Sequence, residues 1–427
     1  MMDDYSSLLR KLEGLGVKAG SAIPNTTKGK DTVKHLAIED IIDGHYEKTH
    51  FGDTFTVTTR YPYPYSHGQV PLTPPSSFQS IWKWAKFSDA SLPDIRNICF
   101  LDTETSGLAG GTGTFIFMVG FGAFDSQGFS VTQLFMRDPS EEQAFLATLG
   151  RLTARYSSVV TYNGKSFDIP MLRSRHIQNH FPFEMSDWHH IDLLHLVRQI
   201  WKYSQESRTL KDMEGNILNF QRDQEEVPGW LVPQLYFEYL QNRDPRPLAG
   251  VFYHNAIDIV SLAALFSASA QLMECPFDPI PIPKKEADLI ALARIHENMS
   301  SLQLAASLYA EGIKSGLPVE LELSAIMRFA EFCKRKNNYD EAIILWKKAV
   351  NLGSIDACVE LAKYYEHHCG DVSLASHYTE TALTFLPSVP LFSIRKQRTE
   401  IIHRQGRLLK KMNLLMNNAP GEPHGES

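Results

Sequence analysis

Residues 97–108, NICFLDTETSGL, join an apolar run to two acidic residues. The run at residues 98–101 predicts a buried β-strand, and Asp102 and Glu104 follow it with one residue between them. Side chains two residues apart on a strand point to the same face, so the two carboxylates should emerge side by side. Neighbouring carboxylates repel each other unless a cation lies between them, and oxygen ligands suit Mg²⁺ or Mn²⁺. The pair therefore indicates either a divalent metal site or an ordinary polar strand end.

The length and composition of the chain limit its class. A chain of 427 residues is too long for one hydrophobic core, and its 43% hydrophobic and 21% charged residues are typical of soluble globular domains. The net charge of −7 excludes a uniformly basic nucleic-acid-binding surface but allows a local basic groove. Five scattered cysteines without a CxxC motif predict reduced thiols in a cytoplasmic protein. The first residues lack a signal-peptide pattern, and we expect no transmembrane span.

Residues 1–94 are predicted to form an N-terminal extension. Residues 5–15 suggest a short amphipathic helix. Residues 44–63 alternate as in a β-hairpin, with the Gly-Asp pair at 52–53 as its expected turn. The proline-rich segment at 67–77 is typical of a linker, because proline is excluded from central strands.

Residues 95–273 predict an α/β domain. Apolar runs with short connections indicate three strands, which should form an antiparallel meander. Two further strands should alternate with helices, and the order predicts a mixed sheet with helices on its faces. The three meander strands are expected near 98–105, 115–124 and 129–138, the later strands near 158–163 and within 188–201, and helices near 139–156, 169–179 and 254–272.

Residues 285–390 carry no strand pattern and predict helical repeats. A small, large, small pattern at i, i+4 and i+7 occurs three times, and its second and third copies lie 33 residues apart. This spacing is close to the tetratricopeptide period of about 34 residues, and the alternative is a plain helical bundle. The three sets are Ala305, Tyr309 and Gly312; Ala342, Trp346 and Ala349; and Ala375, Thr379 and Ala382.

Residues 391–427 predict a basic helix and a disordered tail. Seven Lys or Arg residues and one Glu lie between Arg395 and Lys411. Such a helix is either a solvated face that closes the repeats or a surface that contacts nucleic-acid phosphates.

Three more acidic residues lie in contexts that suit a functional site. Asp168 follows a predicted strand and the Asn163-Gly164 turn, Asp192 ends an apolar run, and Asp258 lies on an apolar helix four residues after His254. Each has a structural alternative. Asp168 could cap a helix, Asp258 could be an exposed helix residue, and Asp192 could be a strand-end or capping acid.

Taken together, these segments resemble a known family. The four acids of the DEDD exonucleases, which have the RNase H-like fold, match in order and context Asp102, Glu104, Asp168 and Asp258. Three sequence segments closely resemble the YprB-like group of RNase H-like proteins: DTETSGLAGGTGT, TYNGKSFDIPMLRSR and HNAIDIVSLAAL. The resemblance covers residues 95–270 strongly and 285–390 in architecture, since that group commonly carries tetratricopeptide repeats. It implies an RNase H-like mixed sheet flanked by helices, followed by an α-helical repeat domain.

The resemblance also implies a chemistry. It implies a two-metal nuclease, most simply a 3′→5′ exonuclease, that uses Mg²⁺ or Mn²⁺ on a single-stranded 3′ end of DNA or RNA. Asp102 would bridge both ions, Asp258 would complete one shell with the catalytic Glu104, and Asp168 would hold the second ion. The alternatives are a catalytically silent nucleic-acid-binding protein, an interaction scaffold built on the repeats, and a structure-selective endonuclease. A protein partner could bind the repeats, and no membrane partner is expected.

The proton acceptor departs from the family patterns. One subclass places Tyr four residues before the last Asp and the other places His five before it, whereas this chain has His254 at four and Tyr253 at five. On a helix, His254 would lie about 40° from Asp258 and Tyr253 about 140° away. A helix that includes residue 253 therefore predicts His254 as the base, and a later start favours Tyr253. The alternative for His254 is a capping role through Nδ1.

Two further segments are candidates for contact with the substrate. Gly111 and Thr112 lie in a glycine-rich loop that could approach a nucleotide closely, or that could be a simple β-turn. Asn163 and Lys165 are placed for sugar or phosphate contact, although Asn163 could serve only to shape its turn.

Overall fold

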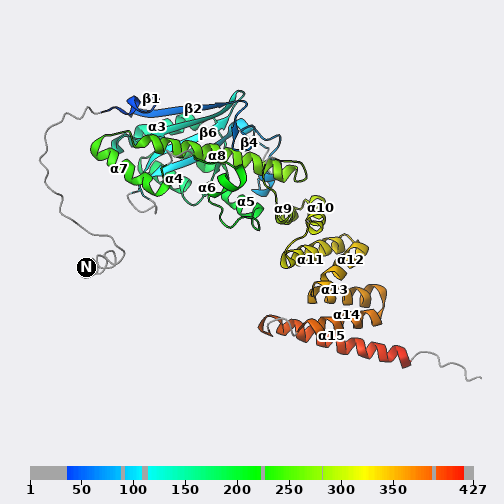
Figure 1. The fold of residues 1–427 in the computed structure, drawn as a ribbon. Helices are drawn as coiled ribbons and strands as arrows, with labels where there is room; N and C mark the ends of the chain where they lie inside the picture. The colour runs from blue at the N-terminus through cyan, green and yellow to red at the C-terminus, as the bar shows by residue number, and fades with distance from the viewer. Residues whose placement is uncertain are drawn as a thin grey trace, which may run out of the picture.

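The computed structural model describes residues 36–87, 92–107, 114–222, 227–280, 282–386 and 391–417. The predicted helix at 5–15 and the Gly111-Thr112 segment lie outside the described residues. A sheet covered by helices forms one end of the molecule, and a row of helices extends from it to α15 at the other end (Figure 1).

A seven-stranded mixed sheet, in the order β1-β2-β7-β6-β5-β8-β9, organises the first part. The meander β5-β6-β7 is antiparallel, and β8 and β9 add to it in parallel, as the sequence predicts. A separate pair of short strands, β3 and β4, lies at Ser66–His67 and Val70–Pro71. The strands of the main sheet are β1 His45–Thr49, β2 Gly52–Pro62, β5 Ile98–Thr105, β6 Ile116–Phe124, β7 Gly128–Phe135, β8 Ser158–Thr161 and β9 His189–Asp192.

The N-terminal hairpin differs from its prediction in two respects. Its turn is at His50 and Phe51, because Thr49 already pairs with Gly52. The Thr49 hydroxyl closes this turn by accepting from the Phe51 amide at 3.1 Å, and a lone threonine is a weaker turn signal than the Gly-Asp pair that misled the prediction. Residues 55–62 of strand β2 also pair with the whole of β7, so the hairpin extends the main sheet.

Helices cover both faces of the sheet. The side chains of β5 alternate between the two faces and show which helices lie on each. Ile98 and Phe100 pack with α5 and α8 on one face, and Cys99 and Leu101 pack with α3 and α4 on the other. The helices of this part are α2 Gln79–Trp84, α3 Glu142–Thr153, α4 Asp168–Gln178, α5 Leu193–Ile200, α6 Leu210–Met213, α7 Val232–Asn242 and α8 Leu248–Glu274.

Helix α8 is the longest helix of the α/β part and lies across β5, β6 and β7. Within the described residues it is the one helix long and apolar enough to cross a membrane, but 89% of its apolar window is buried inside the protein. Its hydrophobicity is accounted for by its position in the core.

The C-terminal part consists of helices packed in consecutive pairs, α9 with α10, α11 with α12 and α13 with α14. All nine residues of the small, large, small pattern are buried. Gly312 shows why the small positions matter, since a Cβ there would collide with Ile290 of the paired helix. The assignment to tetratricopeptide repeats stays a prediction. The helices are α9 Glu286–Asn298, α10 Leu302–Lys314, α11 Val319–Arg335, α12 Tyr339–Asn351, α13 Ile355–Tyr364, α14 Val372–Phe385 and α15 Leu391–Asn417.

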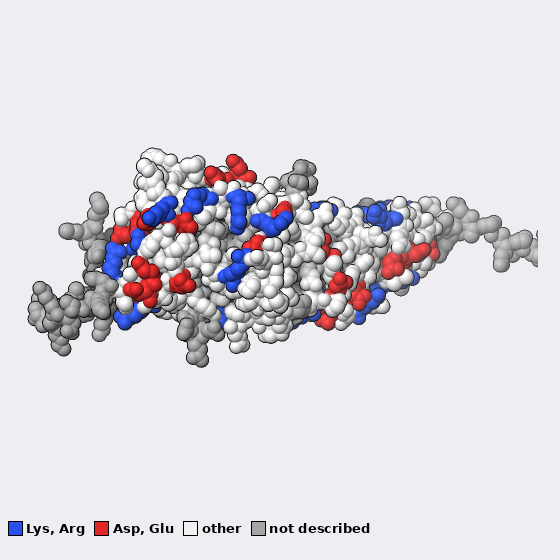
Figure 2. All heavy atoms as spheres, turned by 90° about the horizontal axis from the view of Figure 1, so that it is seen from above, with Lys and Arg blue, Asp and Glu red and all other residues white. Residues whose placement is uncertain are grey.

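The surface charge is mixed where it can be seen. On the face shown in Figure 2, basic and acidic side chains of the described residues are interspersed along both parts of the molecule. This distribution agrees with the small negative net charge.

Candidate active site

Asp102 and Glu104 lie on the last half of β5, on the strand face covered by α8. Their approach to α8 depends on Gly120, which pairs directly opposite Asp102 on β6. A Cβ on Gly120 would collide with the Asn255 side chain of α8, so only glycine lets this helix lie so close to the sheet. The close approach brings Asp258 of α8 to the two strand acids.

A buried chain of hydrogen bonds orients Asp102. Asn255 Nδ2 donates to Asp102 Oδ2 at 2.9 Å. Gln133 Nε2 in turn donates to Asn255 Oδ1 at 2.9 Å and to the Phe252 carbonyl at 2.8 Å. Sequence reasoning missed Asn255 and Gln133, although a polar residue three positions before Asp258 on an apolar helix was a usable signal.

Asp168 reaches the same region from the opposite side of β5. It is the first residue of α4 and is 8% exposed. Thr103 Oγ1, which alternates with Asp102 along the strand, donates to Asp168 Oδ1 at 2.5 Å. Phe167 occupies the N-cap position, and the Asp168 side chain makes a tertiary contact in place of the predicted capping alternative.

These acids hold like charges close together in a buried site. Burial, followed by the negative charges of Asp258, Glu104 and Asp168, raises the pKa of Asp102 well above its ordinary range. Burial and the charges of Asp258 and Asp168 likewise raise the pKa of Glu104. Burial raises the pKa of Asp168 to about 6, although the Thr103 hydrogen bond opposes the shift. We refer to Asp102, Glu104, Asp168 and Asp258 as the acid cluster.

His254 and Tyr253 face different surroundings. Helix α8 begins at Leu248 and thus includes both residues, which is the condition under which the sequence favours His254. His254 Nε2 lies 3.4 Å from Asp258 Oδ2. Burial raises the pKa values of the Tyr61 and Tyr65 phenols, and the nearby Tyr253 adds a smaller rise to each. The helix therefore points His254, and not Tyr253, toward the acid cluster.

An arginine from the connection between α6 and α7 also enters the site. Arg222 Nη2 pairs with Asp258 Oδ1, and Arg222 Nη1 lies 3.1 Å from His254 Nδ1. Glu214 holds the same guanidinium through two bonds, to Nε at 2.7 Å and to Nη2 at 2.6 Å. Sequence reasoning missed Arg222 and Glu214, because an insertion rich in charged residues gives no indication of which side chain turns inward.

Asp192 has a structural role. Its carboxylate caps α5 by accepting from the Leu194 amide at 3.2 Å. It also accepts from the backbone amides of Asn163 at 2.8 Å and Lys165 at 3.1 Å, which holds the loop before Asp168. Asn163 adopts a φ of 69°, so it shapes this turn, and the Lys165 side chain is exposed. A substrate contact by either residue stays a prediction.

The donors of the acid cluster fit a divalent cation in chemistry. Their oxygens are hard ligands, and their mutual repulsion would be relieved by a positive charge. In the part of the chain that the structure describes, however, no three His, Cys, Asp or Glu side chains are arranged as a preformed metal-binding group. One reason is visible at Asp258, where Oδ1 is directed to Arg222.

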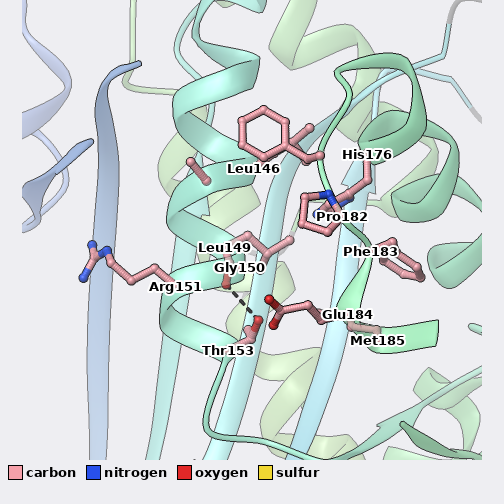
Figure 3. Close-up of a pocket in the computed structure, with 12 residues that line it drawn as sticks. Leu146, Leu149, Gly150, Arg151, Thr153, His176, Pro182, Phe183, Glu184 and Met185 are labelled. Atoms are coloured by element: carbon pink, nitrogen blue, oxygen red, sulfur yellow. Dashed lines mark hydrogen bonds between the residues drawn. The ribbon is translucent and has the colours of Figure 1, made fainter. Parts of the chain in front are cut away.

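Two cavities of the α/β part lie along α3 and α4, and no residue of the acid cluster lines either of them. Figure 3 shows a pocket between α3 and the segment that follows α4, in which the Glu184 side chain points toward α3. The volume of this pocket is about 240 Å³. Lys165 and Arg173 line a larger cleft of about 750 Å³ along α4. The cleft thus has two exposed cations, Arg173 on α4 and Lys165 in the turn before this helix.

The basic helix α15 is tied to the repeats by its own charges. Arg404, Arg407 and Lys411 lie 2.8, 2.7 and 2.8 Å from the carboxylate of Glu366, whose side chain is fully buried. These three cations are thus engaged within the protein, which favours the interpretation of α15 as a face that closes the repeats.

Comparison with known proteins places this site in a family context. Residues 99–269 match the model of the RNase_H superfamily, and they form an RNase H superfamily domain with the mixed sheet described above. This domain match indicates a nucleic-acid-related function. The chain is 29% identical over 369 residues to the uncharacterized protein YprB of Bacillus subtilis (strain 168), across 82% of this chain and 84% of that protein. The resemblance to the YprB-like group is confirmed.

A solved structure shows a weaker likeness. The family B DNA polymerase from the hyperthermophilic archaeon Pyrobaculum calidifontis is 15% identical, with a TM-score of 0.31. The match covers 65% of this chain but only 34% of the polymerase, so the chain spans about a third of its length.

Proposed function

We propose that this protein is a metal-dependent nuclease that hydrolyses phosphodiester bonds, acting as a 3′→5′ exonuclease. The observation that carries the proposal is the convergence of four mutually repelling acids, from β5, α4 and α8, in an RNase H superfamily domain. Two divalent ions, Mg²⁺ or Mn²⁺, held by these acids would neutralise the non-bridging oxygens and the leaving oxygen of a phosphodiester.

The protein's own side chains have distinct roles in this proposal. Asn255 orients Asp102, and Thr103 orients Asp168, so both carboxylates are held before substrate binds. His254 takes the proton of the attacking water, because it faces Asp258 and an imidazole is a better base near neutral pH than a phenol. Glu104 adds a carboxylate at the same strand end.

The regions around the acid cluster and the free cysteines support proposals for the binding partners and the cellular location of the protein. The cleft that carries Lys165 and Arg173 supports a nucleic-acid strand beside α4. The paired helices α9–α14 would bind a protein partner or a further part of the substrate. All five cysteines are free, which supports a reducing, cytoplasmic environment.

A second candidate is a nucleic-acid-binding protein without catalytic activity. The contact between Arg222 and Asp258 favours it, because this contact engages one of the four acids.

A degradation assay separates the two candidates. Single- and double-stranded DNA and RNA, labelled at the 5′ end, are incubated with Mg²⁺ or Mn²⁺ and the wild type, Asp102→Asn or Asp187→Asn. Asp187 is an exposed acid outside the cluster and is the matched control. We expect a ladder of shortened products that Asp102→Asn abolishes and Asp187→Asn retains. Binding without cleavage of any substrate would establish the silent protein.

A further inference from the structure

Arg222 brings a positive charge against the acid cluster on a rigid support. Its side chain is 5% exposed, and that of its partner Glu214 is 1% exposed. The two bonds between them fix both the position and the plane of the guanidinium. Arg222 is therefore held in a defined orientation.

The support of Glu214 is itself well anchored. Glu214 begins the π-helix η5, Glu214–Leu218, and the Leu218 carbonyl accepts from the Gln69 amide at 2.8 Å. Gly68 lies so close to this carbonyl that a Cβ there would collide with it. Beside it, His67 Nε2 lies 2.7 Å from Ser261 Oγ of α8. The segment that carries Glu214 is thus packed between β3-β4 and α8.

Arg222 occupies hydrogen-bonding atoms of two residues of α8, His254 and Asp258. Arginine has only donors, so His254 Nδ1 must accept from Nη1. The ring proton then resides on Nε2, 3.4 Å from Asp258 Oδ2. In this arrangement neither ring nitrogen can take a proton from water, and Asp258 Oδ1 is also occupied by Arg222.

We infer that Arg222 is a resident cation of the acid cluster that competes with divalent ions for Asp258. A divalent ion bound through Asp258 and a base at His254 need the atoms that Arg222 holds, so Arg222 must release both residues before metal-dependent hydrolysis begins. This inference rests on the proposed function and adds a control step to it. Glu214 serves as the positioning residue that keeps Arg222 in place.

The test measures metal binding directly, on the full chain without nucleic acid. Free Mn²⁺ is followed by electron paramagnetic resonance during titration of the wild type and of Glu214→Gln/Arg222→Met. The double variant removes both charges, since Arg222→Met alone would leave Glu214 buried as an anion without its cation. We expect the double variant to bind Mn²⁺ about tenfold more tightly or better, as expected when a competing charge at contact distance is removed. The matched control Arg198→Met, an exposed arginine on α5, should bind Mn²⁺ as the wild type does.

The outcomes separate this inference from the proposed function. Equal or weaker Mn²⁺ binding by the double variant, with a circular dichroism spectrum like that of the wild type, overturns the inference alone. Absence of Mn²⁺ binding by every protein overturns both the inference and the metal-dependent function. If the double variant does not fold, Glu214→Gln/Arg222→Gln takes its place, because it also removes both charges but keeps a hydrogen-bonding side chain at each position; tighter Mn²⁺ binding is again the expected result and unchanged binding the contrary one. A larger rise in Tm on Mn²⁺ addition than in the wild type is the second readout.

Discussion

The acid cluster of the sheet and Glu366 of the helical part are two opposite solutions to a buried carboxylate. In the cluster, burial and the charges of neighbouring carboxylates raise the pKa values of Asp102 and Glu104. At Glu366, three cations from α15 surround one carboxylate. Burial alone would raise its pKa, but the hydrogen bonds and charges of Lys411 and Arg407 outweigh burial and lower the pKa to about 2. Like charges left together cost stability and create a site for a cation, whereas a neutralised charge joins one helix to another. Both regions are rich in charged residues, but only the first retains a demand for a ligand.

The largest expected effect separates the two regions by activity. Glu104→Gln should lower nuclease turnover by about 10³-fold or more, because it removes a carboxylate from the cluster. Glu366→Gln should leave turnover per folded molecule unchanged on a short single strand. Initial rates at saturating Mn²⁺ measure both. Similar losses in the two variants would contradict the comparison.

The next effect is the loss of stability at Glu366. Glu366→Gln should lower the free energy of unfolding by about 2 to 3 kcal/mol at pH 7, because three cations lose their buried partner. Because the pKa of Glu366 is lower in the folded protein than in the unfolded chain, its ionised form stabilises the fold at pH values above the ordinary pKa of Glu. This contribution is lost as the pH falls through about 2. Urea denaturation should therefore show a large difference from the wild type at pH 7 and a smaller one at pH 3. Glu400→Gln, an exposed acid on α15, is the control and should be neutral.

A steric prediction tests how the cluster is assembled. Gly120→Ala should push α8 away from β6, lower stability by about 2 kcal/mol and reduce turnover with it. Gly150→Ala, in open space on α3, should be neutral or slightly stabilising. Unaltered activity in Gly120→Ala would show that the close approach of α8 is not required.

The smallest expected effect is a pH dependence opposite to that of Glu366. The pKa of Asp168 is raised to about 6, so the folded protein binds this proton more tightly than the unfolded chain. Its contribution to stability therefore declines as the pH rises from about 4 to about 6. In EDTA, Asp168→Asn should remove this decline and gain about 1 to 2 kcal/mol at pH 8. Denaturation curves at pH 4, 6 and 8 measure it, and a constant difference across that range would exclude the raised pKa.

The sequence predicted the strands and helices of the α/β domain well, because buried strands and amphipathic helices leave periodic patterns. It did not predict that the N-terminal hairpin joins the main sheet. The alternation of residues 44–63 identifies strands, but the partner of β2 is β7, whose residue Phe135 pairs with Phe55. Local patterns do not specify pairings between segments so far apart in the chain.

The same limit applies within the candidate site. By itself, the sequence determined the residue types and their spacing: the acids Asp102 and Glu104 on one strand face, Asp258 on an apolar helix, and His254 one helical turn before it. Only the tertiary structure decided that Asn255 orients Asp102, that Gly120 admits α8, and that Arg222 reaches Asp258. The physical reason is that strand and helix periods place side chains on faces, whereas contacts between faces depend on packing among residues distant in the chain.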